Sequence, residues 1–404
     1  MKPFLKIILN HPFLILITVL TIGLTPATGQ EVGQTERLIS PEINPDNSVT
    51  FRINAPKAAS VEVTGNWMPM ISNEAGGMMR KTLVLTKDNK GIWSAKSEVL
   101  APELYGYSFL VDGVTTLDPS NLMIARDGIF RTESMLYVPG EGSDLYWANK
   151  GPKGSIHEIW YESPTLVLTR RMVVYTPPGY ETSTVDYPVL FLLHGGGGDE
   201  EAWSTLGVAP NIMDNLINSG KAKAMIVVMT NGNPSQAAAF TVSPKQIATS
   251  TNVGGMANMQ FEKSLIHDVI PYITAHFRVK SDKENRALTG LSMGGLQTMN
   301  TSFMEPALFD YIGVMSMGFA DLSRFGIDVD HSKREQQILA LKKEQPKVYW
   351  IACGKDDFLY ESVVTMRNEL DKQQFPYVYR ESTGGHTWTN WRIYLTEFAQ
   401  MIFN

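Results

Sequence analysis

The sequence predicts an α/β domain with a mostly parallel β-sheet, preceded by an all-β sandwich. Up to about residue 140, short runs of alternating hydrophobicity lie between turn signals, which is the pattern of a sandwich. From residue 154 onward, apolar β-branched runs alternate with segments of helical period, which favours a parallel sheet covered on both faces. A Gly-x-Ser-x-Gly segment lies at 290–294, between a predicted strand and a predicted helix. In an α/β domain this pattern indicates a tight strand–turn–helix that exposes a serine.

Length and composition limit the classes of protein to which the chain can belong. It has 404 residues, which suggests two or three domains, and its 43% hydrophobic and 19% charged residues are ordinary for globular proteins. A net charge of −6 gives no basic field, so we expect no nucleic-acid partner. The single cysteine, Cys353, excludes an intramolecular disulfide and any multi-cysteine metal site.

The N-terminal residues have the pattern of a secretory signal. Lys2 and Lys6 precede an apolar run, 13–24, and small residues follow as far as Gly29. This run is too short to span a bilayer comfortably, although an uncleaved anchor is the alternative. We therefore expect 1–29 to be a signal peptide and the mature protein to be secreted or periplasmic, with no integral membrane segment.

The all-β sandwich is expected at 38–140, followed by a linker rich in glycine and polar residues at 141–153. Four aromatic residues in this region, Trp67, Trp93, Tyr105 and Tyr107, could stack on sugar rings. Alternation could instead place Trp93 and one tyrosine in the sandwich core. The predicted strands are 49–53, 60–64, 81–85, 91–97, 105–111 and 134–138.

The α/β domain is expected at 154–404. In the longest helical segment, 261–277, Phe261, Leu265, Val269 and Ile273 recur every four residues and predict one buried stripe. The predicted strands are 166–175, 189–193, 224–229, 286–291, 311–315, 348–352 and 377–380. The predicted helices are 208–219, 261–277, 294–303, 332–343, 360–373 and 389–403.

The segment at 290–294 predicts a nucleophilic serine. It closes a predicted strand and opens a predicted helix, which is the context that this motif requires in α/β-hydrolases. Gly290 and Gly294 remove side chains that would collide in so tight a turn. We therefore interpret Ser292 as a nucleophile and not as an ordinary turn residue.

A nucleophilic serine needs a basic histidine, and the chain has two histidines after Ser292. His331 lies in a charged segment and is expected at the surface. His386 follows two glycines on a loop before the last predicted helix, so its ring can reach the edge of the sheet. We predict His386 as the base.

The acid that orients the histidine should follow the strand 348–352, because the expected chain order is serine, acid, histidine. Asp356 and Asp357 are adjacent there. We favour Asp357, because Phe358 and Leu359 should pack under the loop and bury it. Asp356 is the alternative.

Two backbone amides should form an oxyanion hole. One belongs to Met293, at the start of the helix that follows the serine. The other should come from the run His-Gly-Gly-Gly-Gly at 194–198, where we favour Gly196 over Gly197. This glycine run is not a phosphate-binding loop, because no Gly-Lys-Ser/Thr follows it.

The residues that contact substrate are harder to identify. The long segment 232–258 carries a single charge and either walls a pocket or is mobile. Asn231 precedes it, while Trp203 and Trp388 flank the glycine run and His386. We treat these three as candidate substrate contacts, although both tryptophans could be core residues.

Four segments, 175–180, 190–195, 265–272 and 286–295, resemble the esterase D-like, feruloyl-esterase-type members of carbohydrate esterase family 1. The resemblance runs from about Gly154 to the C-terminus and implies an α/β-hydrolase fold with Ser292, Asp357 and His386 as nucleophile, acid and base. Segments 49–56, 61–65 and 105–113, with Asp118-Pro119, resemble the Ig-like early-set domains of carbohydrate-binding module family 48.

This resemblance implies an exported enzyme that removes feruloyl or acetyl groups from xylan, so the expected partners are acylated xylan or a feruloylated oligosaccharide. No cofactor or metal is expected. One alternative is an esterase acting on a catecholate trilactone siderophore; another is a non-catalytic carbohydrate-binding protein. Because the predicted catalytic residues all follow Gly195, we expect the chain from Gly151 onward to retain activity on small esters.

Overall fold

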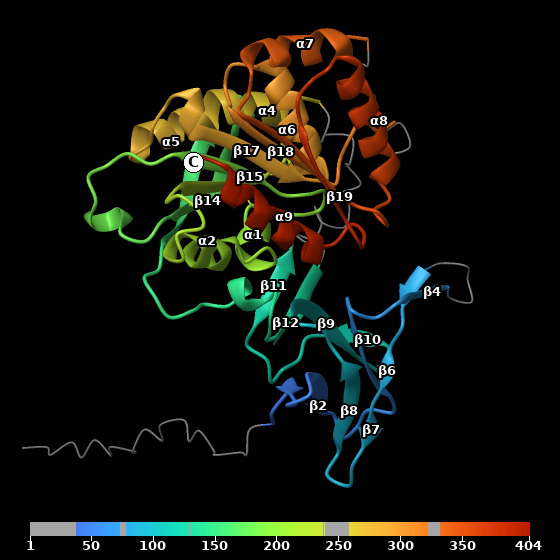
Figure 1. Ribbon diagram of the computed structural model, residues 1–404. Coiled ribbons are helices and arrows are strands. Elements are labelled where there is room, and N and C mark those ends of the chain that lie inside the picture. The colour runs from blue at the N-terminus through green and yellow to red at the C-terminus, as the bar shows by residue number, and fades with distance from the viewer. Residues whose placement is uncertain (1–37, 73–77, 129–130, 237, 239–257, 322–331) are drawn as a thin grey trace, which may run out of the picture. The chain divides into compact units, whose positions relative to one another are not determined.

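The computed structural model describes residues 38–72, 78–128, 131–236, 238, 258–321 and 332–404 (Figure 1). The predicted signal segment, 1–29, and most of the segment 232–258 lie outside these residues.

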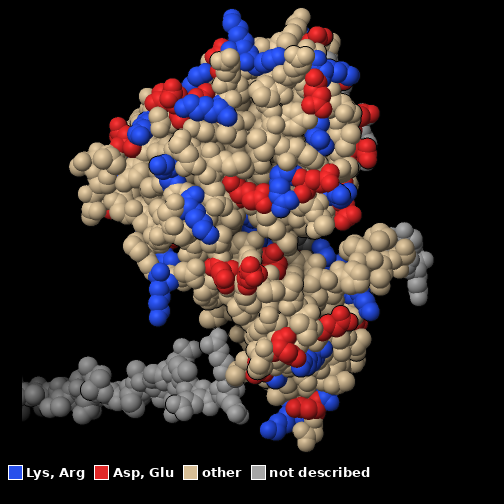
Figure 2. Space-filling model, viewed as in Figure 1, with Lys and Arg blue, Asp and Glu red and all other residues tan. Residues whose placement is uncertain are grey.

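On the face shown in Figure 2, acidic and basic side chains are interspersed.

The C-terminal part is built on an eight-stranded sheet, which confirms the predicted α/β class. The antiparallel hairpin β13–β14 pairs antiparallel with β16, and the remaining pairs from β16 to β20 are parallel. Strands β15 to β18 are buried along their whole length, as the continuous apolar runs predict. The order across the sheet is β13 (Ser155–Ser163), β14 (Leu168–Thr176), β16 (Ile226–Thr230), β15 (Val189–Leu193), β17 (Arg286–Leu291), β18 (Tyr311–Met315), β19 (Val348–Gly354) and β20 (Val378–Ser382).

Helices cover both faces of this sheet (Figure 1). A core on one face joins the sheet to α4 (Gln260–Ser264), α5 (Ile270–His276), α6 (Met293–Met304), α7 (Arg334–Glu344) and α8 (Tyr360–Lys372). A π-helical turn, Leu265–Val269, links α4 to α5, and the predicted stripe from Phe261 to Ile273 is buried. On the other face lie α1 (Ala202–Thr205), α2 (Ala209–Asn218) and α9 (Trp388–Met401).

The N-terminal part consists of two antiparallel sheets that share an apolar core. The first sheet has the order β1 (Glu42–Ile43), β2 (Ser48–Asn54), β8 (Ile92–Val99), β7 (Thr86–Lys87). The second has the order β11 (Ile124–Asp127), β12 (Arg131–Val138), β9 (Glu103–Val111), β3 (Val61–Gly65), β6 (Leu83–Val84), with β10 (Val114–Thr116) beside β9. A separate hairpin joins β4 (Met70–Ser72) to β5 (Met78–Arg80).

The second of these sheets contributes to two cores. On β12, Leu136 and Val138 belong to the core between the two N-terminal sheets. Their neighbour Met135 points the other way and joins Leu104 and Ala125 in the core that contains α2 and α9. Residues Leu38–Asn404 accordingly form one unit. The N-terminal strands are therefore part of the structure that carries α9, and not a separately tethered module.

Arg392 on α9 forms hydrogen bonds across the junction between the N-terminal strands and the α/β part. Its side chain is 1% exposed, and its guanidinium donates to the carbonyl oxygens of Leu206 (2.6 Å) and Leu104 (2.7 Å) and to the carboxylate of Glu103 (3.1 Å). A buried arginine with three acceptors is stable only while all of them are present.

We predict that Arg392→Ala lowers the free energy of unfolding by about 3–5 kcal/mol, because it leaves Glu103 buried without its partner. Urea denaturation measures the change. Arg380, whose ion pair with Glu397 is roughly one-third exposed, provides the control. Arg380→Ala should cost at most about 1 kcal/mol. Equal losses for the two variants would contradict this account of the junction.

Candidate active site

Ser292 lies in the tight turn between β17 and α6, as its motif predicts. Its backbone has φ 53° and ψ −116°, a conformation that non-glycine residues rarely adopt. A Cβ atom on Gly290 would lie 2.5 Å from the backbone of Gly294, and a Cβ atom on Gly294 would lie 2.6 Å from the carbonyl oxygen of His194. Both positions therefore require glycine, and the second does so because the turn packs against the end of β15.

His386 and Asp357 lie together. The Nδ1 atom of His386 is 3.0 Å and 2.9 Å from the two carboxylate oxygens of Asp357, whose side chain is fully buried. Because a carboxylate can only accept, Nδ1 carries the proton and Nε2 is left to act as a base. The adjacent Asp356 is exposed. The structure thus brings Asp357 to the histidine, as expected.

Phe358 and Leu359 were both expected to pack under the loop beside Asp357. Leu359 is buried, but Phe358 is 60% exposed and does not pack there. Its ring lies 4.5 Å from the imidazole of His386, and the ring of Trp391 meets the imidazole edge-on at 4.9 Å. The two aromatic rings therefore flank the imidazole, and the expected packing of Phe358 beneath the loop is wrong.

Ser292 and His386 line one pocket of about 240 Å³. Among the residues that the structure describes, no hydrogen bond joins the serine hydroxyl to the imidazole, a contact that often tightens only when substrate binds. Gly196 and Trp388 also line this pocket.

The glycine run lies directly beside the serine. A Cβ atom on Gly195 would be 3.3 Å from the Cβ atom of Ser292 and 2.5 Å from Cδ1 of Leu291, so a side chain there would crowd both residues. Gly196 follows in the pocket wall, and Met293 begins α6 on the other side of the serine. Gly196 thus shares a pocket with Ser292, and Met293 is the next residue along the chain. Their amides as the oxyanion hole remain a prediction.

Two of the three candidate substrate contacts are not in the pocket lining. Trp203 is 1% exposed, and its Nε1 donates to the carbonyl oxygen of Leu193 at 2.9 Å. Asn231 is fully buried and donates to Glu200 at 3.0 Å. Both side chains serve as packing and hydrogen-bonding groups behind the site. Position beside a motif in the sequence could not distinguish them from Trp388, which does line the pocket.

Part of the pocket wall comes from the N-terminal strands, which the sequence analysis did not predict. Asn66, Arg80, Tyr105 and Glu133 line the pocket together with Ser292. They lie more than 150 residues before the serine, and no motif connects them to it. The pocket wall thus extends into the N-terminal strands, although the predicted catalytic residues all follow Gly195. That the chain from Gly151 onward retains activity on small esters stays a prediction.

The other N-terminal aromatic residues occupy the sandwich core. Trp93 is 8% and Tyr107 1% exposed, and the ring of Trp67 stacks on Phe51 at 5.8 Å. Trp93 and Tyr107 therefore provide no exposed stacking surface. Within the described part of the chain, no group of three or more histidine, cysteine, aspartate or glutamate side chains could hold a metal ion.

The helix that follows Ser292 packs against a buried acid. Glu262 is fully buried and accepts a hydrogen bond from Asn300 on α6 at 2.8 Å. Its other carboxyl oxygen has no hydrogen-bond partner. Burial raises the pKa of Glu262 to about 7, and the bond from Asn300 only partly opposes this rise.

We predict that Asp357→Asn lowers kcat by about 10³- to 10⁴-fold, because an amide cannot fix the tautomer or stabilise the imidazolium. Asp356→Asn, at the exposed neighbour, is the matched control and should leave kcat within about twofold, since it contacts neither ring nor serine. Steady-state hydrolysis of p-nitrophenyl acetate measures both. A larger loss for Asp356→Asn would move the acid by one residue.

Glu262 should make stability fall as pH rises. Because its pKa is raised on folding, the protonated form favours the folded state below about pH 4.5, and this contribution is lost as pH passes about 7. The free energy of unfolding of the wild type, relative to Glu262→Gln, should fall by about 3 kcal/mol between these limits. Urea denaturation at both ends of the range measures this difference, and a difference independent of pH would contradict the burial of an ionisable Glu262.

Comparisons with known proteins identify the family of the chain. A family model described as "Putative esterase" matches residues 163–401. An endo-1,4-beta-xylanase/feruloyl esterase of Xylanibacter ruminicola is 34% identical over 284 residues, which are 69% of this chain and 36% of that protein. The chain thus spans about a third of the length of this relative.

Two solved structures share the fold. A CE1 ferulic acid esterase of Anaeromyces mucronatus, in complex with ferulic acid, has a TM-score of 0.52 at 23% identity, over 64% of this chain and 95% of that one. The enterobactin esterase of Shigella flexneri, in the presence of enterobactin, has a TM-score of 0.62 at 16% identity, over 87% of this chain and 92% of that one.

The family match covers more than half of the chain and ends within α9, so it includes the serine turn, the acid and the histidine. The chain therefore belongs to the esterase family that this model defines.

Proposed function

We propose that the protein is a serine carboxylic ester hydrolase that removes feruloyl or acetyl groups from xylan. The observation that carries the proposal is the combination of a strained Ser292 and an Asp357-bound His386 in one pocket. Such a turn costs about 1–3 kcal/mol of backbone strain and persists where the serine has to be presented to a substrate.

The mechanism follows from the positions of these groups. His386 Nε2 takes the proton of the Ser292 hydroxyl while the serine oxygen attacks the ester carbonyl. The amides of Gly196 and Met293 stabilise the oxyanion, and the alcohol leaves with the proton from His386. Water, activated by the same imidazole, then releases the acid from the acyl-enzyme. Asp357 stays ionised and stabilises the imidazolium in both steps.

The choice of xylan esters rests on two kinds of support. The relative from Xylanibacter ruminicola carries feruloyl esterase activity in its name at 34% identity, although most of its length lies outside the match. The pocket is walled by Trp388 on one side and by the polar groups Asn66, Arg80 and Glu133 on the other. An aromatic or small acyl group can pack beside Trp388, while sugar hydroxyls can bond to the polar wall. Carbohydrate binding by the N-terminal strands would then take place at the active site.

A siderophore trilactone is the second candidate. Residues 154–404 make up about 62% of the chain, so the match of 87% to the enterobactin esterase must include part of the N-terminal strands. Two arginines, Arg80 and Arg392, line the pocket. Arg392 is already bound to Glu103 and two carbonyls, and Arg80 donates to the carbonyl oxygen of Asn66. Because the charge of Arg392 is paired with Glu103, the pocket does not present the cluster of positive charge that a catecholate site would favour, which supports the xylan ester.

We further propose that the protein is exported, with 1–29 removed as a signal peptide. The support is the sequence pattern of basic, apolar and small residues. In the part of the chain that the structure describes, no helix is long and apolar enough to cross a membrane.

A panel of esters tests the proposed function. Wild-type protein should release ferulate from methyl ferulate or acetate from acetylated xylan faster than it opens a catecholate trilactone. Ser292→Ala should lower kcat on the preferred ester by about 10⁴- to 10⁶-fold, because the remaining triad residues cannot replace the nucleophile. Preference for the trilactone would select the second candidate. Hydrolysis that is equally fast in Ser292→Ala would refute the mechanism.

A further inference from the structure

The loop that should provide the Gly196 amide has no side chains over four residues. A turn bond from the amide of Gly198 to the carbonyl oxygen of Gly195 (3.1 Å) closes it, and contacts at its two ends fix where this turn lies. At its start, Nδ1 of His194 donates to the carbonyl oxygen of Gly195 at 2.7 Å, and its Nε2 accepts from the amide of Gly232 at 2.8 Å. Because a carbonyl only accepts and an amide only donates, these two bonds define a neutral imidazole with the proton on Nδ1. The start of the loop is therefore fixed from within the α/β part.

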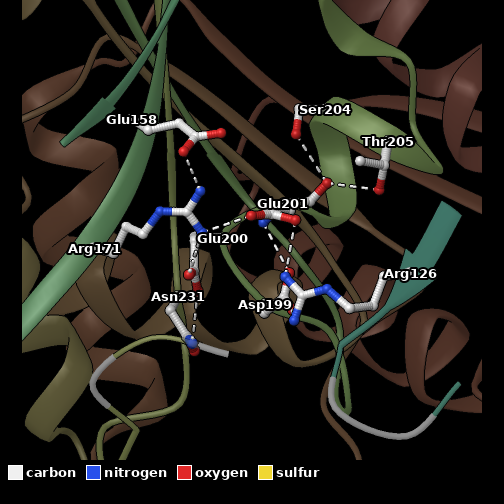
Figure 3. A network of polar contacts seen from close by, with 9 residues as sticks. All are labelled: Arg126, Glu158, Arg171, Asp199, Glu200, Glu201, Ser204, Thr205 and Asn231. Atoms are coloured by element: carbon white, nitrogen blue, oxygen red, sulfur yellow. Dashed lines mark hydrogen bonds and ion pairs between the residues drawn. The ribbon is translucent and has the colours of Figure 1, made fainter. Parts of the chain in front are cut away.

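The other end of the loop runs into three consecutive acids, Asp199, Glu200 and Glu201 (Figure 3). Asp199 and Glu200 are buried, and Oδ1 of Asp199 accepts from the amide of Glu201 at 2.8 Å. Arg171 on β14 contacts Glu200 at 3.2 Å and Glu201 at 2.5 Å. Arg171 also contacts Glu158 at 2.7 Å. This cation inside the α/β part is therefore shared among Glu158, Glu200 and Glu201, while Asp199 is paired from elsewhere.

The second cation comes from the N-terminal strands. Arg126 on β11 contacts Asp199 at 2.9 Å through Nη1 and Glu201 at 2.9 Å through Nη2 (Figure 3). Its side chain is 24% exposed, whereas that of Asp199 is fully buried. A guanidinium that bridges two carboxylates in this way fixes their spacing as well as their charge.

The backbone of the same hairpin also contacts the glycines. Gly128 follows β11 with φ +59°, and a Cβ atom there would lie 1.6 Å from the carbonyl oxygen of Gly197. Only glycine permits this approach. Gly128 therefore packs directly on the loop, one residue beyond the predicted oxyanion amide of Gly196.

Removing Arg126 would leave Asp199 buried beside Glu201 without its nearest cation. Burial already raises the pKa of Asp199 to about 6, and the charge of Arg126 opposes that rise. A buried carboxylate without its partner is strongly unfavourable, so the acids would move toward solvent or take up a proton. Either change would shift the end of the loop, because a run of glycines has few steric restraints on its backbone dihedral angles.

From this geometry we infer that Arg126 is a positioning residue for the oxyanion hole, acting through Asp199 and Glu201 on the glycine loop. The inference rests on the proposed serine esterase function. It assigns to the N-terminal strands a role in the chemical step itself, in addition to their place in the pocket wall.

The test compares Arg126→Ala with Arg52→Ala. Arg52 lies on β2 in a half-exposed ion pair with Glu42 at 2.7 Å and contacts no part of the loop, so its variant controls for loss of a sandwich arginine. Arg126→Ala should lower kcat for p-nitrophenyl acetate by about 10- to 100-fold with KM within about twofold, less than the loss expected for complete removal of an oxyanion donor. Arg52→Ala should leave both constants unchanged.

Inhibition by phenylboronic acid separates positioning from general damage. Its tetrahedral adduct with serine places an oxygen in the oxyanion hole, so Arg126→Ala should raise its inhibition constant by about the same factor as it lowers kcat. A variant that merely contained less folded protein would show a lower apparent kcat with an unchanged inhibition constant, and that result would overturn the inference. Arg126→Lys keeps the positive charge but cannot bridge the two carboxylates as a guanidinium does. Its kcat and its inhibition constant should lie between those of the wild type and of Arg126→Ala. If Arg126→Ala does not fold, the same two measurements on Arg126→Lys decide.

The outcome also separates this inference from the function on which it rests. A wild-type protein without activity on p-nitrophenyl acetate or any ester of the panel would refute the esterase function. An active wild type whose kcat and boronate inhibition are unaffected in Arg126→Ala would refute the role of Arg126 alone.

Discussion

The backbone conformation of Ser292 is the constraint on which the rest of the site depends. At φ 53° and ψ −116° the residue is strained, and the surrounding structure must over-determine it. It does so by close backbone contacts that only glycine allows at Gly290 and Gly294, and by a 2.9 Å hydrogen bond from the serine amide to the carbonyl oxygen of Met315. The strand order β15–β17–β18 places these partners on either side of the turn. The parallel sheet therefore holds the Ser292 hydroxyl in one fixed position at the end of β17.

A serine fixed in this way still needs an oxyanion hole, and here the two parts of the chain depend on each other. The glycine loop can approach the serine because it lacks side chains, and for the same reason no side chain of its own anchors it to the rest of the structure. The N-terminal sheet provides Arg126 to the end of that loop and Met135 to the core beneath α9. Arg392 ties α9, which begins two residues after His386, to the same sheet. The glycine loop and the helix that follows His386 are therefore both held by the same N-terminal sheet.

The roles of Ser292, His386 and Asp357 stay predictions, but sequence reasoning located what has a local signal. Motifs and strand ends led it to residues that the structure brings together, and the buried strands are continuous apolar runs. It failed where contacts are long-range: Arg126 lies on β11, a four-residue strand that gave no periodic signal. β13 was missed because it is an edge strand whose Ile156 and Trp160 face solvent. Trp203 was misjudged because adjacency to a motif does not reveal which way a ring points. One hint of the shared core was present in 135–138, Met-Leu-Tyr-Val, since an uninterrupted apolar run favours burial on both faces.

The central claim is that Ser292 is the nucleophile presented by this turn, and covalent trapping tests it most directly. Incubation with a p-nitrophenyl alkylphosphonate, followed by mass spectrometry of the intact and digested protein, locates the modified residue. The account predicts a single adduct, confined to the peptide that carries Ser292 and formed in step with the loss of esterase activity. An adduct on another residue, or full activity in protein that is completely modified at Ser292, would contradict it.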